Sequence, residues 1–163
     1  MDELFAPPGT LWQAVSPALA RMRRLLVAAA AVLLAAAVVA AALVLGFPGW
    51  LTALLLAVVL LAAVVAWVLV GRNARWWGYA ERDEDLYVRH GGVFRTLVVV
   101  PYGRMQYVDV ETGPLERAFG VASVHLHTAS PGTSARIPGL PAAEAARLRD
   151  RLTVLGEAQA AGL

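Results

Sequence analysis

The stretch "VPYGRMQYVDVETGPLERAFGVASVHLHTA", Val100–Ala129, decides the fold class of this 163-residue chain. Apolar and polar side chains alternate from Gln106 to Glu111 and again from Val121 to Thr128, which is typical of strands with one buried face. Between these runs, Pro114 suits the start of a short amphipathic helix and Gly120 suits its end. The stretch therefore predicts a strand, a single helical turn and a second strand.

The sequence on either side of this stretch extends the same pattern. Short apolar or alternating runs predict strands at residues 76–81, 86–89, 94–100 and 135–137, separated by the turn signals "RDED" and "HGG". Residues Ala145, Leu148, Leu152 and Leu155 recur at helical spacing, so a C-terminal helix is expected at about 141–155. Several antiparallel strands and one helix pack most economically as a small bent sheet or barrel closed at one end by the helix.

Two long uncharged runs precede this region, at residues 25–46 and 50–70. Each is long enough to cross the roughly 30 Å of hydrocarbon in a bilayer as a helix. Only "FPG" separates them, and Pro and Gly interrupt a helix, so an antiparallel transmembrane hairpin is expected. A cleaved signal peptide is disfavoured, because the first run exceeds the usual apolar core of a signal and a second run follows at once.

The arginines predict the orientation of this hairpin. Three precede the first run and two follow the second, while the connecting turn carries no charge. The positive-inside rule then places both termini in the cytoplasm. We expect a cytoplasmic tail at 1–15, the hairpin at 16–71 and a cytoplasmic domain at 72–163. The candidate membrane-interface residues are Trp12, Arg21, Arg23, Arg24, Arg72, Arg75, Trp76 and Trp77.

Two segments carry a resemblance to a known family: "ERDEDLYVRHGGVFRTLVVVPYGRMQYVDVETGPLERAFGVASVHLHTA" at 81–129 and "IPGLPAAEAARLRDRL" at 137–152. With the two preceding spans, they resemble the YdbS-like family of membrane-anchored bacterial pleckstrin-homology (PH)-like domains. The resemblance implies an α+β membrane protein, in which a transmembrane hairpin precedes a bent antiparallel sheet capped by a C-terminal helix. It implies no reaction, and it suggests a larger relative with several PH-like domains as a partner.

The most recognisable residues of this resemblance have two interpretations. They shape the turn and short helix as a folding device, or they present polar groups to a partner. Arg117 is expected to pair with Asp109 or Glu111, or to reach a backbone carbonyl. The residues concerned are Arg104, Gln106, Gly113, Pro114, Arg117 and Gly120.

Metal and catalytic sites are not expected. The chain has no cysteine, and His125 and His127 share one strand face, which His90 could approach. No carboxylate has supporting spacing, so zinc is disfavoured. The acidic cluster in "ERDED", at 81–85, lacks the glycine and spacing of a calcium loop and is read as a solvated turn. No nucleophile elbow or phosphate loop is present, so we predict no enzyme and no cofactor.

The function expected from these observations is a non-catalytic, membrane-tethered interaction module. Its PH-like domain would bind a membrane-protein partner or a second copy at the cytoplasmic face. The alternatives are a domain that binds or organises the lipid of the inner leaflet, and an accessory subunit of an envelope-stress or transport system. Net charge is +2, and residues 72–163 hold 11 Arg against 10 acidic residues, so nucleic acid is not an expected partner.

Overall fold

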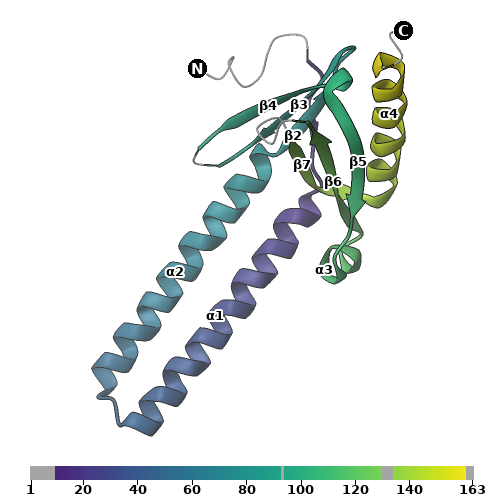
Figure 1. Ribbon diagram of the computed structural model, residues 1–163. Coiled ribbons are helices and arrows are strands. Elements are labelled where there is room, and N and C mark those ends of the chain that lie inside the picture. The colour runs from purple at the N-terminus through teal and green to yellow at the C-terminus, as the bar shows by residue number, and fades with distance from the viewer. Residues whose placement is uncertain (1–9, 93, 130–133, 161–163) are drawn as a thin grey trace.

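Two long helices project from one end of a small β-rich domain (Figure 1). The computed structural model describes residues 10–92, 94–129 and 134–160. Helix α1 covers Pro17–Leu45 and helix α2 covers Gly49–Trp76. Both are long and apolar enough to cross a membrane, and their apolar stretches leave large side chains exposed rather than packed in a core. The chain is therefore a membrane protein with two candidate spans, and the predicted hairpin is observed.

Local sequence explains where α1 begins and ends. The Ser16 hydroxyl accepts a hydrogen bond from the Ala18 N–H at 3.2 Å, and Pro17 occupies the first helical position. Gly46 ends the helix with a left-handed φ of 67°. The 29 residues of α1 span about 44 Å, which exceeds the roughly 30 Å of hydrocarbon in a bilayer. The arginine-bearing end of α1 therefore continues beyond the apolar segment into the domain.

The domain contains two antiparallel sheets. The first has the order β1-β2-β3-β4 and the second has the order β5-β6-β7. The strands are β1 (Gln13–Ala14), β2 (Gly78–Glu81), β3 (Asp85–His90), β4 (Thr96–Pro101), β5 (Met105–Glu111), β6 (Val121–Thr128) and β7 (Ala135–Pro141). A 3-10 turn, η2 (Tyr102–Arg104), separates the sheets, and the short helix α3 (Pro114–Ala118) joins β5 to β6. This is the α+β arrangement expected for a PH-like domain.

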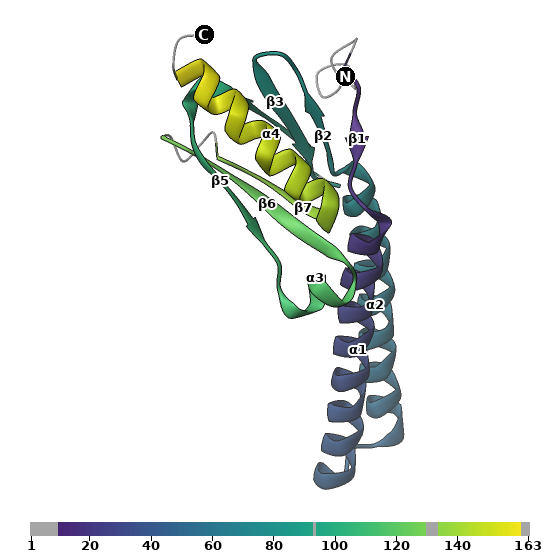
Figure 2. The same ribbon diagram turned by 90° about the vertical axis from the view of Figure 1, so that its right-hand side faces the viewer.

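Helix α4 (Ala142–Ala160) packs in the angle between the two sheets (Figure 2). Its Leu148 and Leu152 are fully buried, together with core side chains of both sheets such as Leu86 and Leu126. Polar contacts fasten α4 to the first sheet as well, because Arg147 forms an ion pair with Glu81 of β2 at 2.5 Å. The C-terminal helix therefore closes the domain as the sequence predicts, and it runs five residues further than expected.

The hairpin is inserted between β1 and β2. Residues 13–14 pair with 78–79, although 28- and 29-residue helices separate the two strands along the chain. Val15, Leu19 and Met22 join the buried core of the domain. This differs from the loose tail expected for 1–15, of which residues 1–9 lie outside the described residues. The reason is that a two-residue strand has no sequence pattern of its own and forms only because β2 offers a free edge.

Some strand boundaries also differ from the expectation. The strand predicted from Trp76 begins at Gly78, because α2 continues through Trp76 before the chain turns. The strand predicted at 135–137 extends to Pro141, because Val121 and Ala122 of β6 provide partners for its second half. The predicted order of strand, short helix and strand in the stretch 100–129 is observed, with β6 at the predicted residues.

Candidate membrane-interface site

Five elements meet where the hairpin enters the domain. The first turns of α1 contact β7 and α3, and the last turns of α2 contact β3. Figure 1 shows α3 beside α1 and the β3–β4 hairpin beside α2, on opposite sides of the two helices. The backbone N–H of Ser16 donates a 2.9 Å hydrogen bond to the carbonyl of Gly139 in β7, which ties the start of α1 to the second sheet. The junction is therefore a packed region rather than a free linker.

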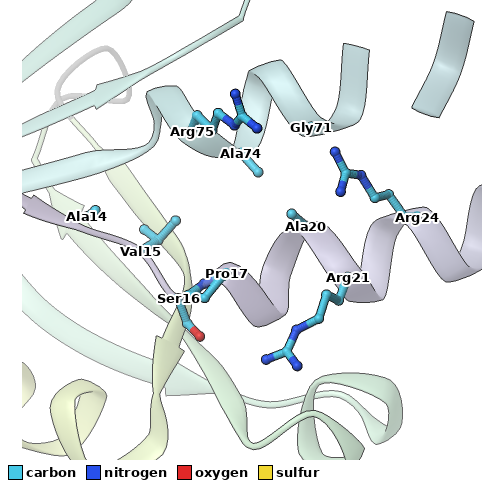
Figure 3. A pocket seen from close by; sticks show the side chains of 10 residues that line it. All are labelled: Ala14, Val15, Ser16, Pro17, Ala20, Arg21, Arg24, Gly71, Ala74 and Arg75. Atoms are coloured by element: carbon cyan, nitrogen blue, oxygen red, sulfur yellow. The ribbon is translucent and has the colours of Figure 1, made fainter. Parts of the chain in front are cut away.

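A cavity of about 390 Å³ opens between α1 and α2 at this junction (Figure 3). Its lining combines small side chains, which leave the space between the helices unfilled, with three arginines at its walls and rim. Arg24 of α1 reaches across toward Gly71 of α2, where an added Cβ would lie 2.2 Å from a guanidinium nitrogen. The complete lining is Ala14, Val15, Ser16, Pro17, Ala20, Arg21, Arg24, Gly71, Ala74 and Arg75.

The cavity is cationic and lacks an acidic counterpart. No carboxylate lines it, and Arg21, Arg24 and Arg75 form no ion pair with any carboxylate among the residues that the structure describes. The Nε of Arg24 is buried without a hydrogen-bond partner, while its guanidinium carbon lies 5.2 Å from the centre of the Trp67 ring. A buried donor on a cation is costly unless an acceptor is supplied, so an anion would complete this group.

A second cluster of charges fixes α3 against β6 and β7. Glu116 accepts hydrogen bonds from the Ser123 hydroxyl at 2.9 Å and from the Gly113 N–H at 3.0 Å. Arg136 of β7 donates to Ser123 at 3.2 Å, and Arg23 of α1 lies within electrostatic range of Glu116 and Arg136. The sequence reasoning named Gly113 and missed Glu116. The available signal was its place at the third position of the helix, where a glutamate bonds back to the cap.

The structure separates the residues of the family resemblance into two groups. Gly113, Pro114, Arg117 and Gly120 surround α3 near α1, and Gly120 has the left-handed φ of 67° that the sequence suggested. Arg104 ends η2 and Gln106 lies at the start of β5, at the opposite end of that strand from α3, and both are exposed. The six residues therefore do not form one surface.

Among the described residues, Arg117 forms neither of the two ion pairs that the sequence offered for it, with Asp109 or with Glu111. Asp109 and Glu111 instead lie beside histidines of the neighbouring strand, with His127 Nε2 3.7 Å from Asp109 and His125 Nε2 3.3 Å from Glu111. Cross-strand neighbours on one face of a sheet are closer than a residue of the following helix, which explains the preference. Arg117 is exposed at the outer side of α3.

The tryptophans near the junction pack on the domain. The guanidinium carbon of Arg89 lies 4.4 Å from the Trp12 ring centre. The Trp77 ring stacks on His90 at 4.9 Å. Arg95 lies 3.6 Å from the Trp76 ring centre, and Arg72 is exposed on the same end of α2. Cation–π and stacking contacts account for the positions of these indoles without requiring direct contact with lipid.

The β3–β4 turn carries an aromatic side chain that the sequence reasoning missed. Phe94 is 86% exposed and shares a hollow of about 250 Å³ with Leu69 and Asn73 of α2. The turn packs directly on α2, because a Cβ added to Gly92 would lie 2.9 Å from the backbone of Asn73. Phe94 was expected inside a strand. Its place after two glycines was the only signal that it lies in the turn.

The three histidines do not converge. His90 lies against Trp77, whereas the rings of His125 and His127 are 6.4 Å apart on the second sheet. Among the described residues, no group of three His, Cys, Asp or Glu side chains is arranged to hold a metal ion. The acidic cluster at 81–85 is only in part the solvated turn that was expected. Arg82 and Asp85 form a local ion pair at 3.9 Å, whereas Glu81 forms ion pairs with Arg147 and Arg151 of α4.

Comparisons with known proteins agree with this architecture. Residues 21–154 match the model of the bacterial PH domain family. The chain is 34% identical over 110 residues to the UPF0699 transmembrane protein YdbS of Bacillus subtilis (strain 168), a match that covers 67% of this chain and 68% of that protein. No solved structure matches the chain. The extent of the family match, over the hairpin and the sheets together, shows that this chain belongs to the bacterial PH domain family.

Proposed function

We propose that this protein is a non-catalytic module that holds its PH-like domain docked on the inner leaflet of the bacterial cell membrane. The observation that carries the proposal is the position of two loops along the hairpin, which sets their depth relative to the membrane. Phe94 lies beside Leu69, at the end of the apolar part of α2, and α3 lies beside the first turns of α1. Both loops would reach the boundary between headgroups and hydrocarbon while the hairpin spans the bilayer.

The arginines support the inner leaflet as the docking surface. Arg21, Arg23, Arg24, Arg72 and Arg75 all lie at the domain end of the hairpin, and the turn at the other end has no charge. By the positive-inside rule this end, with both termini, faces the cytoplasm. The anionic lipids of that leaflet would attract the same side chains, at about 1 kcal/mol for each cation near the surface.

The fold favours a fixed orientation of the domain. The segment before α1 pairs with the segment after α2 through β1 and β2, so the domain holds both ends of the hairpin. Leu19 and Met22 of α1 are buried in the domain core. Swinging the domain away from the leaflet would therefore expose apolar side chains, at about 25 cal/mol for each Å² uncovered.

Site-directed fluorescence tests this docking. The chain has no cysteine, so single cysteines at Phe94 and at Ala118, which is exposed on α3, can each carry an environment-sensitive dye. Val154, 64% exposed on α4, provides the matched control. In full-length protein reconstituted into phosphatidylglycerol and phosphatidylethanolamine vesicles, we expect lipid-borne quenchers to affect the dye at 94 and 118 much more than the dye at 154. Equal quenching at all three positions would refute leaflet docking.

A second candidate function is binding of another membrane protein through the outer face of β5 and β6. Tyr107 is 53% exposed there and stacks on His127 with ring centres 4.3 Å apart. Exposed tyrosines are enriched at protein interfaces. In-membrane cross-linking of the full chain tests this, with Tyr107→Ala compared against Val154→Ala. A partner or second copy captured by the parent and by Val154→Ala, but lost in Tyr107→Ala, supports this candidate. Equal capture by both variants counts against it.

A further inference from the structure

We propose that the junction cavity binds one anionic phospholipid of the inner leaflet. The phosphate would lie against Arg24, with Arg21 and Arg75 at the rim adding to its attraction, and one acyl chain would lie in the groove between α1 and α2 directly below. The inference shares the membrane orientation of the proposed function and does not depend on docking of the β3–β4 turn or of α3.

The cavity lies at the depth of a lipid headgroup. From Arg24 to the end of α1 at Leu45 there are 21 residue steps, or about 31 Å of helix, which matches the roughly 30 Å of hydrocarbon in a bilayer. Arg21 lies about one turn further into the polar region, with its side chain directed away from α2, and Arg75 lies at the end of α2 (Figure 3). A phosphate in the leaflet therefore reaches Arg24 without leaving its usual depth, with Arg21 and Arg75 nearby at the rim.

The three arginines differ from other arginines of the domain in their surroundings. Arg147 and Arg151 both bind Glu81, and Arg149 binds Asp150. The cavity has no carboxylate in its lining to neutralise its own arginines. Membrane topology explains why cations lie at this end of the hairpin, but it does not explain why they surround an acid-free cavity. Guanidinium groups bind phosphate with paired, charge-assisted hydrogen bonds, so a phosphate is the fitting anion.

An apolar groove of about 390 Å³ lies below the cavity on the same face of the hairpin. Ala28 follows Arg24 by four residues, and Val68 precedes Gly71 by three, so cavity and groove are stacked along both helices. Trp67 lines the groove and also lies under the Arg24 guanidinium, which places it at the join between the two. The full lining is Val27, Ala28, Ala63, Val64, Trp67 and Val68.

This stacking of a cationic cavity on an apolar groove matches the two ends of a phospholipid. Inside a bilayer the acyl chain gains packing contacts rather than hydrophobic burial, so the arginines would supply most of the preference for an anionic lipid. The groove would supply the preference for a whole lipid over a soluble phosphate. A second groove, of about 310 Å³ and lined in part by Ala30 and Ala62, shares Val27 and Ala63 with the first and extends further from the arginines along both helices; no arginine lines either groove.

The test is lipid retention by the full-length protein, measured by native mass spectrometry after extraction from equimolar phosphatidylglycerol and phosphatidylethanolamine vesicles. We expect Arg24→Gln to lower retention of phosphatidylglycerol about tenfold, because this is the change in affinity that follows from losing one hydrogen bond to a charged group. Arg75→Gln provides an independent variant of the same cavity. Arg149→Gln, on the exposed side of α4, is the control with the same change of charge and is expected to retain the lipid.

The acyl chain is tested separately. Ala28→Leu fills the groove below the cavity, and Ala30→Leu adds the same volume to the other groove. We expect retention to fall in Ala28→Leu only. The proposal is overturned if Arg24→Gln and Arg75→Gln retain as much phosphatidylglycerol as Arg149→Gln. It is also overturned if Ala28→Leu behaves as Ala30→Leu while inorganic phosphate displaces the lipid, because the ligand would then be a free phosphate. Quenching of the dye at position 94 tests leaflet docking of the domain, so its outcome does not depend on either lipid-retention result.

Discussion

The contact between the domain and the hairpin depends on one glycine, and its replacement gives a quantitative test. Gly139 of β7 has a left-handed φ of 72°, and a Cβ placed there would lie 2.6 Å from the Cβ of the buried Leu19 in α1. An alanine in this conformation costs about 1 kcal/mol. Crowding Leu19 adds about 1–3 kcal/mol, because its Cβ is fixed to a helix and cannot move aside. Gly139→Ala should therefore destabilise the domain by about 2–4 kcal/mol.

Gly120 supplies the matched control for this prediction. Its φ is 67°, almost the same, but no atom lies within 4 Å of an added Cβ. Gly120→Ala should show only the conformational cost of about 1 kcal/mol. Denaturant unfolding of the full-length protein in detergent micelles, followed by tryptophan fluorescence, measures both variants. Equal losses for the two variants would refute the close approach of β7 to α1, and with it the rigid attachment of the domain.

Three further predictions concern the domain core and its titrating groups. Leu152→Ala, in the fully buried core, should cost about 2–5 kcal/mol in denaturant unfolding, whereas the exposed Val154→Ala should change the free energy of unfolding by less than about 0.5 kcal/mol. Hydrogen bonds from Arg147 lower the pKa of Glu144, so its stabilising contribution is present above the unfolded pKa of about 4.3 and is lost as pH falls through the folded value. Because Glu144 is partly exposed, the loss should be at most about 1 kcal/mol, and acid titration of unfolding should show a smaller loss in Glu144→Gln. Burial raises the pKa of the Tyr102 hydroxyl to about 12. The contribution of Tyr102 to the free energy of unfolding is therefore complete below about pH 10 and falls by roughly 2–3 kcal/mol as pH rises to 12. Tyr102→Phe should remove this part of the alkaline dependence, which circular dichroism can follow.

Features specified by neighbouring residues could be predicted from the sequence. The apolar run at 25–46 is long enough to cross a bilayer whatever surrounds it, so the membrane hairpin follows from length and composition. The alternation at 121–128 predicted β6 at the observed residues, because successive side chains of a strand point to opposite faces of the sheet. Pro114 and Gly120 marked α3 for equally local reasons.

Features that depend on pairing between distant segments could not be predicted. Gln13–Ala14 become a strand only because β2, on the other side of the hairpin, offers its edge. Glu116 and Ser123 meet because α3 folds back beside β6. Phe94 lies at the end of α2 only because the β3–β4 turn packs on Asn73.

The sequence by itself indicated two candidate membrane spans, a clustered set of arginines at one end of them and a PH-like domain with a C-terminal helix. It could not show which arginines meet a carboxylate from a distant segment, because a sequence records only the charges that are neighbours along the chain. The tertiary structure decided that Arg147 and Arg151 meet Glu81, while Arg21, Arg24 and Arg75 surround an acid-free cavity. The physical reason is that charge compensation depends on distances between segments, and these distances are set by the packing of α1, α2 and β7 around the domain core.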